Sequence, residues 1–127
     1  MENTDSIVLI KAAKEASKNS YSPYSEYAVG AAVLTEKGIF TGTNVENASY
    51  GATMCAERVA LFCAVAEGAR QVLALAVYAA PSLPYPCGMC LQALSEFTSA
   101  EAPVLLSSDS EEKAYIFKDL FPHPFKG

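Results

Sequence analysis

The hydrophobic positions at the start of the chain follow a helical spacing. From Ser6 to Lys18 apolar residues recur every three or four positions, which predicts an amphipathic helix with Asp5 or Ser6 as its N-terminal cap. The predicted apolar face of this helix consists of Val8, Leu9, Ala12, Ala13 and Ala16.

The pattern becomes β-prone after residues 19–27, a stretch rich in Tyr, Ser and Pro. Ala28–Leu34 and Ile39–Thr43 are predicted strands, and the four residues between them end in Gly, which favours a hairpin. After a long loop and a further helix, Val72–Tyr78 forms an apolar, β-prone run. A run of this kind is typical of a buried central strand.

Two more helices are expected in the second half of the chain. In Cys55–Glu67, apolar residues are spaced i, i+3, i+4 and i+7, and Gly68 would end the helix. The predicted buried stripe of this helix consists of Val59, Phe62, Cys63 and Ala66. Another helix should begin near Cys87 or Gly88, after a Pro-rich loop, and continue to about Thr98.

The C-terminal part adds short predicted strands at Val104–Leu106 and Ala114–Phe117 and one helical turn at Phe117–Leu120. Helices therefore alternate with strands after an opening hairpin, which is typical of the α/β class. We expect residues 1–127 to form a single domain. Its predicted fold is a three-layer α-β-α sandwich around a mixed sheet of about five strands.

The amino-acid composition bears on the assembly and the cellular location of this domain. Hydrophobic residues make up 51% of the 127 residues, which indicates either a subunit interface or an alanine-rich core. No segment reaches the ~20 apolar residues that span a bilayer, and the acidic N-terminus is unlike a signal peptide. We therefore expect a cytoplasmic protein with reduced thiols and no membrane partner.

The charge balance argues against a nucleic-acid substrate. The chain has 9 basic and 14 acidic residues, a net charge of −5, and its basic residues are not clustered. Such a field repels a long phosphate backbone but does not penalise a neutral nucleoside.

Three of the four cysteines stand at predicted helix starts: Cys55, and the pair Cys87 and Cys90 in a PCxxC element. Unbonded N–H groups and the helix dipole lower thiol pKa values there, and thiolates bind zinc. Cys63 is expected in the helix core, so three ligands remain. Three protein ligands leave a fourth position for water, as in catalytic zinc sites.

Other interpretations of these residues stay open. The CxxC pair alone could be a thioredoxin-like redox pair, and a closed four-cysteine zinc site would form if Cys63 turned outward. Glu57, two residues after Cys55, favours catalysis because a carboxylate beside a metal-bound water can move protons. Alone, a Glu in a first helical turn could simply interact with the helix dipole.

Cys55-Ala-Glu57 and Pro86-Cys87-Gly-Met-Cys90 together match the all-cysteine form of the zinc deaminase signature. With Tyr24–Ala32, Gly42–Tyr50 and Cys55–Arg58, nearly the whole chain resembles the small, homotetrameric cytidine deaminases. The resemblance implies zinc-dependent hydrolysis of cytidine and deoxycytidine to uridine and deoxyuridine plus ammonia, in pyrimidine salvage. It also implies one Zn²⁺ per chain and a homotetramer with shared active sites.

The resemblance further assigns roles to individual residues. Cys55, Cys87 and Cys90 would bind zinc, while Glu57 would shuttle protons as zinc-bound hydroxide attacks C4 of the pyrimidine. Arg58 would hydrogen-bond a ligand thiolate and so offset the charge of three thiolates. Asn44 and Glu46 would bind the 3′-hydroxyl, and Phe125 would reach into a neighbouring subunit's site. The full set of expected substrate contacts is Tyr27, Asn44, Val45, Glu46, Tyr50 and Phe125.

Two positions depart from the usual pattern of these deaminases. Leu91 follows Cys90 where Arg is usual, and Tyr27 replaces a usual Phe, which bears on charge balance and substrate preference. A deaminase of another small base or a modified cytidine therefore remains an alternative. So does a zinc-stabilised binding module without catalysis, whereas a nucleic-acid-editing deaminase would need a basic, aromatic groove.

Overall fold

One mixed sheet forms the centre of the molecule in the computed structural model, which describes residues 3–127. Its strands are β1 (Gly30–Thr35), β2 (Gly38–Thr43), β3 (Val72–Tyr78), β4 (Pro103–Ser107) and β5 (Glu112–Ile116). They lie in the order β2-β1-β3-β4-β5, with β3 and β4 parallel and the other neighbours antiparallel. The third of the five strands is β3, so the predicted run 72–78 lies in the middle of the sheet.

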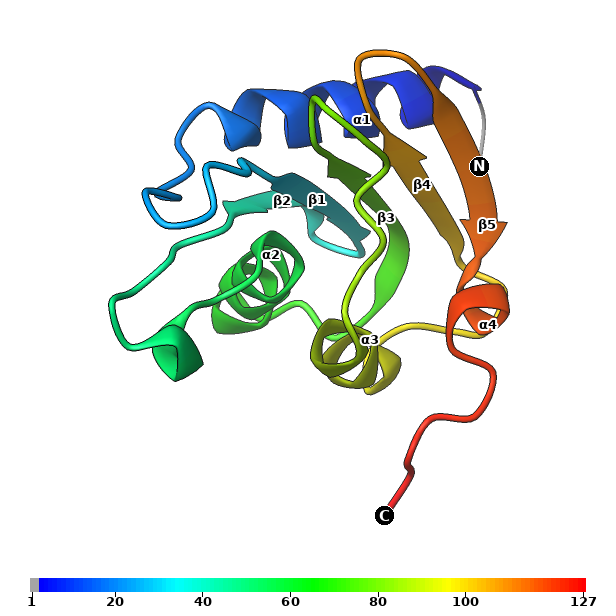
Figure 1. Cartoon of the computed structure of the whole chain (residues 1–127). Coiled ribbons are helices and arrows are strands. Elements are labelled where there is room, and N and C mark those ends of the chain that lie inside the picture. Colours follow the sequence, from blue (N-terminus) through cyan, green and yellow to red (C-terminus); the bar gives the residue numbers. More distant parts are fainter. Residues whose placement is uncertain (1–2) are drawn as a thin grey trace.

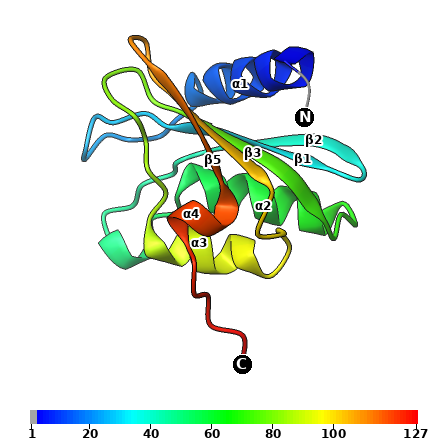
Figure 2. The same ribbon diagram turned by 90° about the vertical axis from the view of Figure 1, so that its right-hand side faces the viewer.

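Helices cover both faces of this sheet (Figures 1 and 2). The helix α1 (Asn3–Ser17) lies on one face, and α2 (Ala56–Ala66) and α3 (Gly88–Ser95) lie on the other. The short α4 (Phe117–Leu120) follows β5 and leads into the C-terminal tail, and a single 3₁₀ turn covers Tyr50–Ala52. The predicted α-β-α sandwich with a five-stranded mixed sheet is therefore confirmed.

The alternation of side chains along β1 divides the core into two clusters. Ala31 and Val33 belong to the cluster under α2 and α3, whereas Ala32 belongs to the cluster under α1. The sequence of β3 shows no such alternation in polarity, because both of its faces are covered and all its residues except Leu73 are buried. None of the helices in residues 3–127 is long and apolar enough to cross a membrane.

Glycine allows α2 to lie directly on the hairpin. A Cβ atom at position 42 would come within 2.7 Å of the Ala56 carbonyl oxygen and would also collide with the Ala60 backbone nitrogen. The first turn of α2 therefore rests on the backbone of β2. This close approach fixes the position of Cys55 and Glu57 relative to the sheet.

The predicted buried stripe of α2 is wrong. The buried residues are Ala56, Glu57, Ala60, Leu61 and Ala64, while Phe62 and Cys63 are exposed. Both faces of this helix carry apolar residues, and close packing on Gly42 selects the face with the smaller side chains. Cys63 is thus not a core residue in this chain.

The first helix also differs from the prediction. It begins at Asn3, so Asp5 and Ser6 lie in the helix and not at its cap, and Asp5 is an acidic residue of the first turn. Leu9 and Ala13 are buried as expected, but Val8 is exposed. The predicted strands and α3 agree with the structure except at their ends, where α3 stops at Ser95.

Candidate active site

Two helix starts bring three cysteines together. Cys55 and Cys87 are the residues immediately before α2 and α3, both in extended conformation, and Cys90 lies in the first turn of α3. Their sulfur atoms all lie within 4.8 Å of one another, and those of Cys55 and Cys87 are 3.8 Å apart. Cys63 is outside this group, so the closed four-cysteine site does not form.

The sulfur geometry fits a zinc ion. With Zn–S bonds of about 2.3 Å in a tetrahedral site, two ligand sulfurs stand about 3.8 Å apart. Cys55 and Cys87 already have this separation, and Cys90 is fully buried beneath them. A soft, all-thiol donor set also suits zinc, and the outward side of the cluster opens toward a cavity.

Hydrogen bonds favour charge on the Cys55 sulfur. The buried Cys90 thiol and the Arg58 guanidinium both hydrogen-bond Cys55, and together they lower its pKa to about 5 despite its burial. Arg58 Nη2 lies 3.6 Å from Cys55 Sγ. The pKa of Cys90 is raised, because its thiol is paired with Cys55 and is buried. Arg58 therefore occupies the place expected of a residue that offsets thiolate charge.

Glu57 is a buried carboxyl group beside this cluster. Its residue is only 5% exposed, because it lies on the inner face of α2. Burial is the main cause that raises the pKa of Glu57 to about 7, and the negative charge on Cys55 adds to it. A carboxyl group in this state can both take up and release a proton near neutral pH.

A cavity of about 450 Å³ lies above the cysteines and Glu57. Six of the residues singled out from the sequence line it: Tyr27, Asn44, Glu46, Cys55, Glu57 and Cys87. Val45 and Phe125 are not among its lining residues. Tyr50 lies instead at an adjoining hollow of about 370 Å³, which shares Ser25, Glu46 and Thr53 with the main cavity.

Asn44 and Glu46 hold the loop that forms one wall of the cavity. The Asn44 amide donates to the Tyr27 carbonyl at 2.8 Å and accepts from the Val29 N–H at 3.0 Å. The Glu46 carboxylate accepts the N–H groups of Tyr24 and Ser25 and the Ser25 hydroxyl, which lower its pKa. Both side chains thus fix the loop as well as lining the cavity, a role that sequence motifs did not indicate.

The opposite wall of the cavity is the Pro-rich loop before Cys87, and tyrosine hydroxyls connect this loop to other parts of the chain. Tyr27 donates from its hydroxyl to the Ser82 carbonyl at 3.3 Å, so the oxygen that Phe would lack bridges the two walls. The hydroxyls of Tyr85 and Tyr115 are 2.6 Å apart. Leu91, at the other departure from the usual pattern, is buried in the hydrophobic cluster under α2 and α3.

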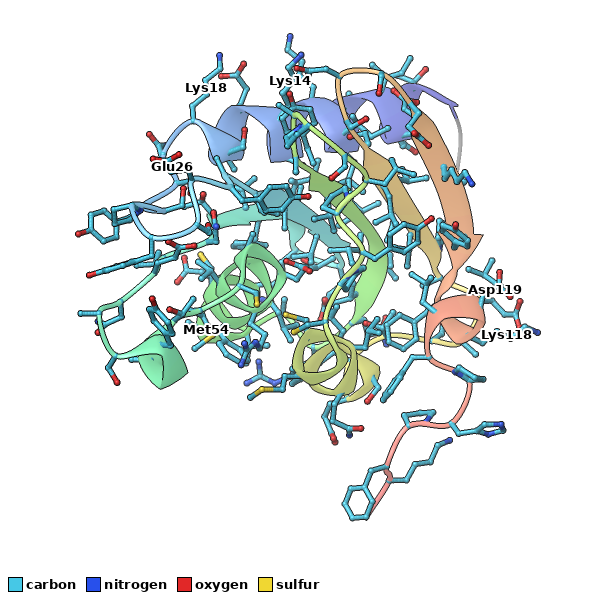
Figure 3. All side chains as sticks on the ribbon, viewed as in Figure 1. Lys14, Lys18, Glu26, Met54, Lys118 and Asp119 are labelled. Atoms are coloured by element: carbon cyan, nitrogen blue, oxygen red, sulfur yellow. The ribbon has the colours of Figure 1, made fainter. Side chains whose placement is uncertain are left out.

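Sequence reasoning missed several lining residues. They come shortly before two cysteines of the cluster in the chain: Thr53 and Met54 before Cys55 (Met54 is labelled in Figure 3), and Leu83, Pro84 and Tyr85 before Cys87. Their nearness to the ligand motifs in the chain is the signal that could have found them. A loop that ends in a metal ligand necessarily approaches the space above the metal.

Comparisons with known proteins place this site in a family. The family model described as "Cytidine and deoxycytidylate deaminase zinc-binding region" matches residues 3–106. The cytidine deaminase of Halalkalibacterium halodurans is 48% identical over 124 residues, which cover 95% of this chain and 94% of the relative. The cytidine deaminase of Mycobacterium tuberculosis is 41% identical over 128 residues, 98% of this chain and 92% of that one.

Solved structures agree with these sequence relatives. The crystal structure of cytidine deaminase from Burkholderia pseudomallei superposes with a TM-score of 0.88 at 41% identity, covering 98% of this chain and all of that one. The resemblance found in the sequence, the enzyme class that it implied and the zinc cofactor are thereby confirmed. The chain belongs to the cytidine and deoxycytidylate deaminase family, and its Cys55, Cys87 and Cys90 form a group positioned to hold a metal ion.

Proposed function

We propose that this chain hydrolyses cytidine and deoxycytidine to uridine and deoxyuridine with release of ammonia, in pyrimidine salvage. The observation that carries the proposal is a buried carboxyl group, Glu57, beside a three-thiol cluster at a cavity of about 450 Å³. This volume is within the usual range of small-molecule sites. The relatives named as cytidine deaminases support cytidine as the nucleoside.

In the proposed reaction, the side chains of the site have separate roles in metal binding and proton transfer. Cys55, Cys87 and Cys90 would hold zinc, which when bound supplies a Lewis acid that makes water nucleophilic near neutral pH. Glu57 would take the proton from the attacking water and pass it to N3 of the pyrimidine. It would then take the proton of the new C4 hydroxyl and deliver it to the amino group, so that the C4 carbonyl forms, the C4–N bond breaks and ammonia leaves.

Binding of the sugar would come from the wall opposite the Pro-rich loop. Asn44 and Glu46 line the cavity and are held rigidly by the loop that they bond, which supports contacts with the 3′-hydroxyl. A contact with the 3′-hydroxyl does not sense the 2′ position. Both the ribonucleoside and the deoxyribonucleoside should therefore be substrates.

The proposal includes a homotetramer with shared active sites. Large apolar side chains stand exposed on the single chain, among them Phe62 on α2, which is 49% exposed, and Phe125 in the tail, which is 76% exposed. Apolar surface of this kind marks contacts between chains. In such an assembly, Phe125 of one chain would complete the cavity of another. The reduced thiol ligands also support a cytoplasmic location.

A substrate panel tests this function. Cytidine, deoxycytidine, cytosine, 5-methylcytidine and adenosine would be followed by ultraviolet absorbance, with the zinc content measured on the same preparation. We expect turnover of the first two nucleosides and about one zinc ion per chain. Bound zinc without turnover of any compound would instead support a binding module, and a preference for cytosine or 5-methylcytidine would overturn the substrate assignment.

A further inference from the structure

The C-terminal tail is held to α3 by one side chain. The Gln92 amide nitrogen donates to the Phe125 carbonyl oxygen at 3.0 Å, and the Phe125 N–H donates to the Gln92 amide oxygen at 3.1 Å. A single glutamine thus bonds both polar main-chain groups of a residue 33 positions away. We call this pair of hydrogen bonds the Gln92 clasp.

The clasp orders the C-terminal tail, a segment with few main-chain hydrogen-bond donors. Pro122 and Pro124 lack an N–H group, and the tail leaves α4 and runs past α3 in an extended course (Figures 1 and 2). A chain terminus of this kind normally frays unless something ties it down. Two hydrogen bonds to Phe125 supply that attachment close to the last residue.

The ring of Phe125 gains nothing from this attachment within its own chain. It is 76% exposed and is not among the residues that line the cavity of the same molecule. The main chain is therefore fixed while the apolar side chain is left in solvent. Such an arrangement makes sense when the ring is covered by a second copy of the chain.

We propose that Gln92 is a positioning residue that presents the Phe125 ring to the substrate cavity of a neighbouring copy. The inference rests on the proposed shared site and adds the device that orients it. Gln92 lies two residues after Cys90 on α3, and this helix begins directly after Cys87, so that it carries or follows two of the three clustered cysteines. The helix that builds one site thus also aims the ring that completes the next site in the assembly.

The test is a double-mutant cycle on the assembled enzyme with cytidine as substrate. Gln92→Ala should raise KM about tenfold, as expected for loss of one to two neutral hydrogen bonds, with little change in kcat or zinc content. Phe125→Ala should raise KM at least as much. Adding Gln92→Ala to Phe125→Ala should then cause no further increase, because Gln92 acts only through that ring.

Two further variants test whether the effect of Gln92→Ala comes from the hydrogen bonds to Phe125. Gln92→Glu keeps an acceptor for the Phe125 N–H but sets a carboxylate against the Phe125 carbonyl, so it should resemble Gln92→Ala in KM. Gln71→Ala is the matched control, since Gln71 is exposed and only its main-chain N–H is bonded, to Glu36. This control should leave KM and kcat unchanged.

Hydrogen exchange gives a readout that does not depend on activity. In the peptide 121–127 two of the residues are prolines without an amide hydrogen, so protection at Phe125 forms a large share of the signal. Gln92→Ala should speed exchange in this peptide, and Gln71→Ala should not. Unchanged exchange in Gln92→Ala would overturn the clasp.

The outcomes separate the clasp from the shared site. If Phe125→Ala leaves KM unchanged, the shared site fails, and the clasp loses its function with it. If Phe125→Ala raises KM while Gln92→Ala does not, only the clasp is overturned. Additive effects of the two substitutions would likewise overturn it, because Gln92 would then act by another route.

Discussion

Glu57 combines burial with a position beside the thiol cluster. Its carboxyl group is enclosed on the inner face of α2, yet it lines the cavity. Glu57→Gln keeps the shape and a hydrogen-bonding group but cannot carry a proton. We expect kcat to fall by about 10²–10⁴, the usual contribution of a general acid–base group, while zinc stays bound.

The measurement is steady-state absorbance with metal analysis on the same sample. Glu67→Gln is the matched control, because Glu67 ends the same helix and is exposed. This control should retain full activity. Activity of Glu57→Gln within tenfold of the unaltered chain would remove Glu57 from the mechanism.

The cysteines allow a comparison within one chain. Cys87→Ala removes a member of the three-sulfur group and should lose zinc and activity together. Cys63→Ala removes an exposed thiol outside the group and should keep both. Zinc release by Cys63→Ala as readily as by Cys87→Ala, measured by metal analysis after dialysis, would contradict the three-ligand site.

At the residue scale, the sequence was sufficient to predict the cysteine cluster, because few residue types can bind zinc. Three thiols at two helix starts converge because α2 and α3 lie on the same face of the sheet and begin close to each other (Figure 2). The double use of Asn44 and Glu46 was not predictable, because their partners are main-chain groups about twenty residues away in an irregular loop. Spacing alone carries no information about such contacts.

At the scale of elements, a side chain in the turn of the first hairpin secures the segment that enters β3. The Glu36 carboxylate accepts the N–H groups of Arg70 at 2.8 Å and Gln71 at 3.1 Å. These hydrogen bonds favour the ionised form and lower the pKa of Glu36. The link joins the β1–β2 turn to the chain that follows α2.

The lowered pKa gives this link a defined pH dependence. The unfolded state binds the proton more readily, so the stabilisation is fully present above the unfolded pKa, about 4.3, and is lost as pH falls through the folded value. The melting temperature of Glu36→Gln should therefore lie below that of the unaltered chain at neutral pH and approach it in acid. Glu96→Gln, at the exposed end of α3, is the control and should show no such convergence. A gap that widened in acid would contradict this role.

Helix α2 shows why element boundaries were easier to predict than buried faces. Its ends follow from Cys55 and Gly68, and these local signals were correct to within a residue or two. Its buried face depends on the partner surface, where Gly42 admits small side chains against the strand. Since both faces of α2 are apolar, periodicity alone could not choose between them.

For the whole molecule, we propose that the exposed face of α2 and the exposed tail have the same explanation, which is contact between copies of the chain. Val59, Phe62, Cys63 and Ala66 were expected in the core of a single chain, yet they face outward or nearly so. A stripe of this size is stable in water when another copy covers it. The apolar composition, which could have meant only an alanine-rich core, thus also supports assembly.

The tail makes that assembly testable through activity. Truncation after Pro122 removes Phe125, whose ring contributes little to the packing of its own chain because it is 76% exposed. We therefore expect KM for cytidine to rise more than tenfold, a loss above about 1.4 kcal/mol of binding, while the melting temperature changes by only a few degrees. Light scattering should show a tetramer before and after truncation, since the outward stripe of α2 is retained. A monomer that is fully active on cytidine would contradict both the assembly and the role of Phe125, because a ring that faces solvent in a lone chain has no cavity to complete.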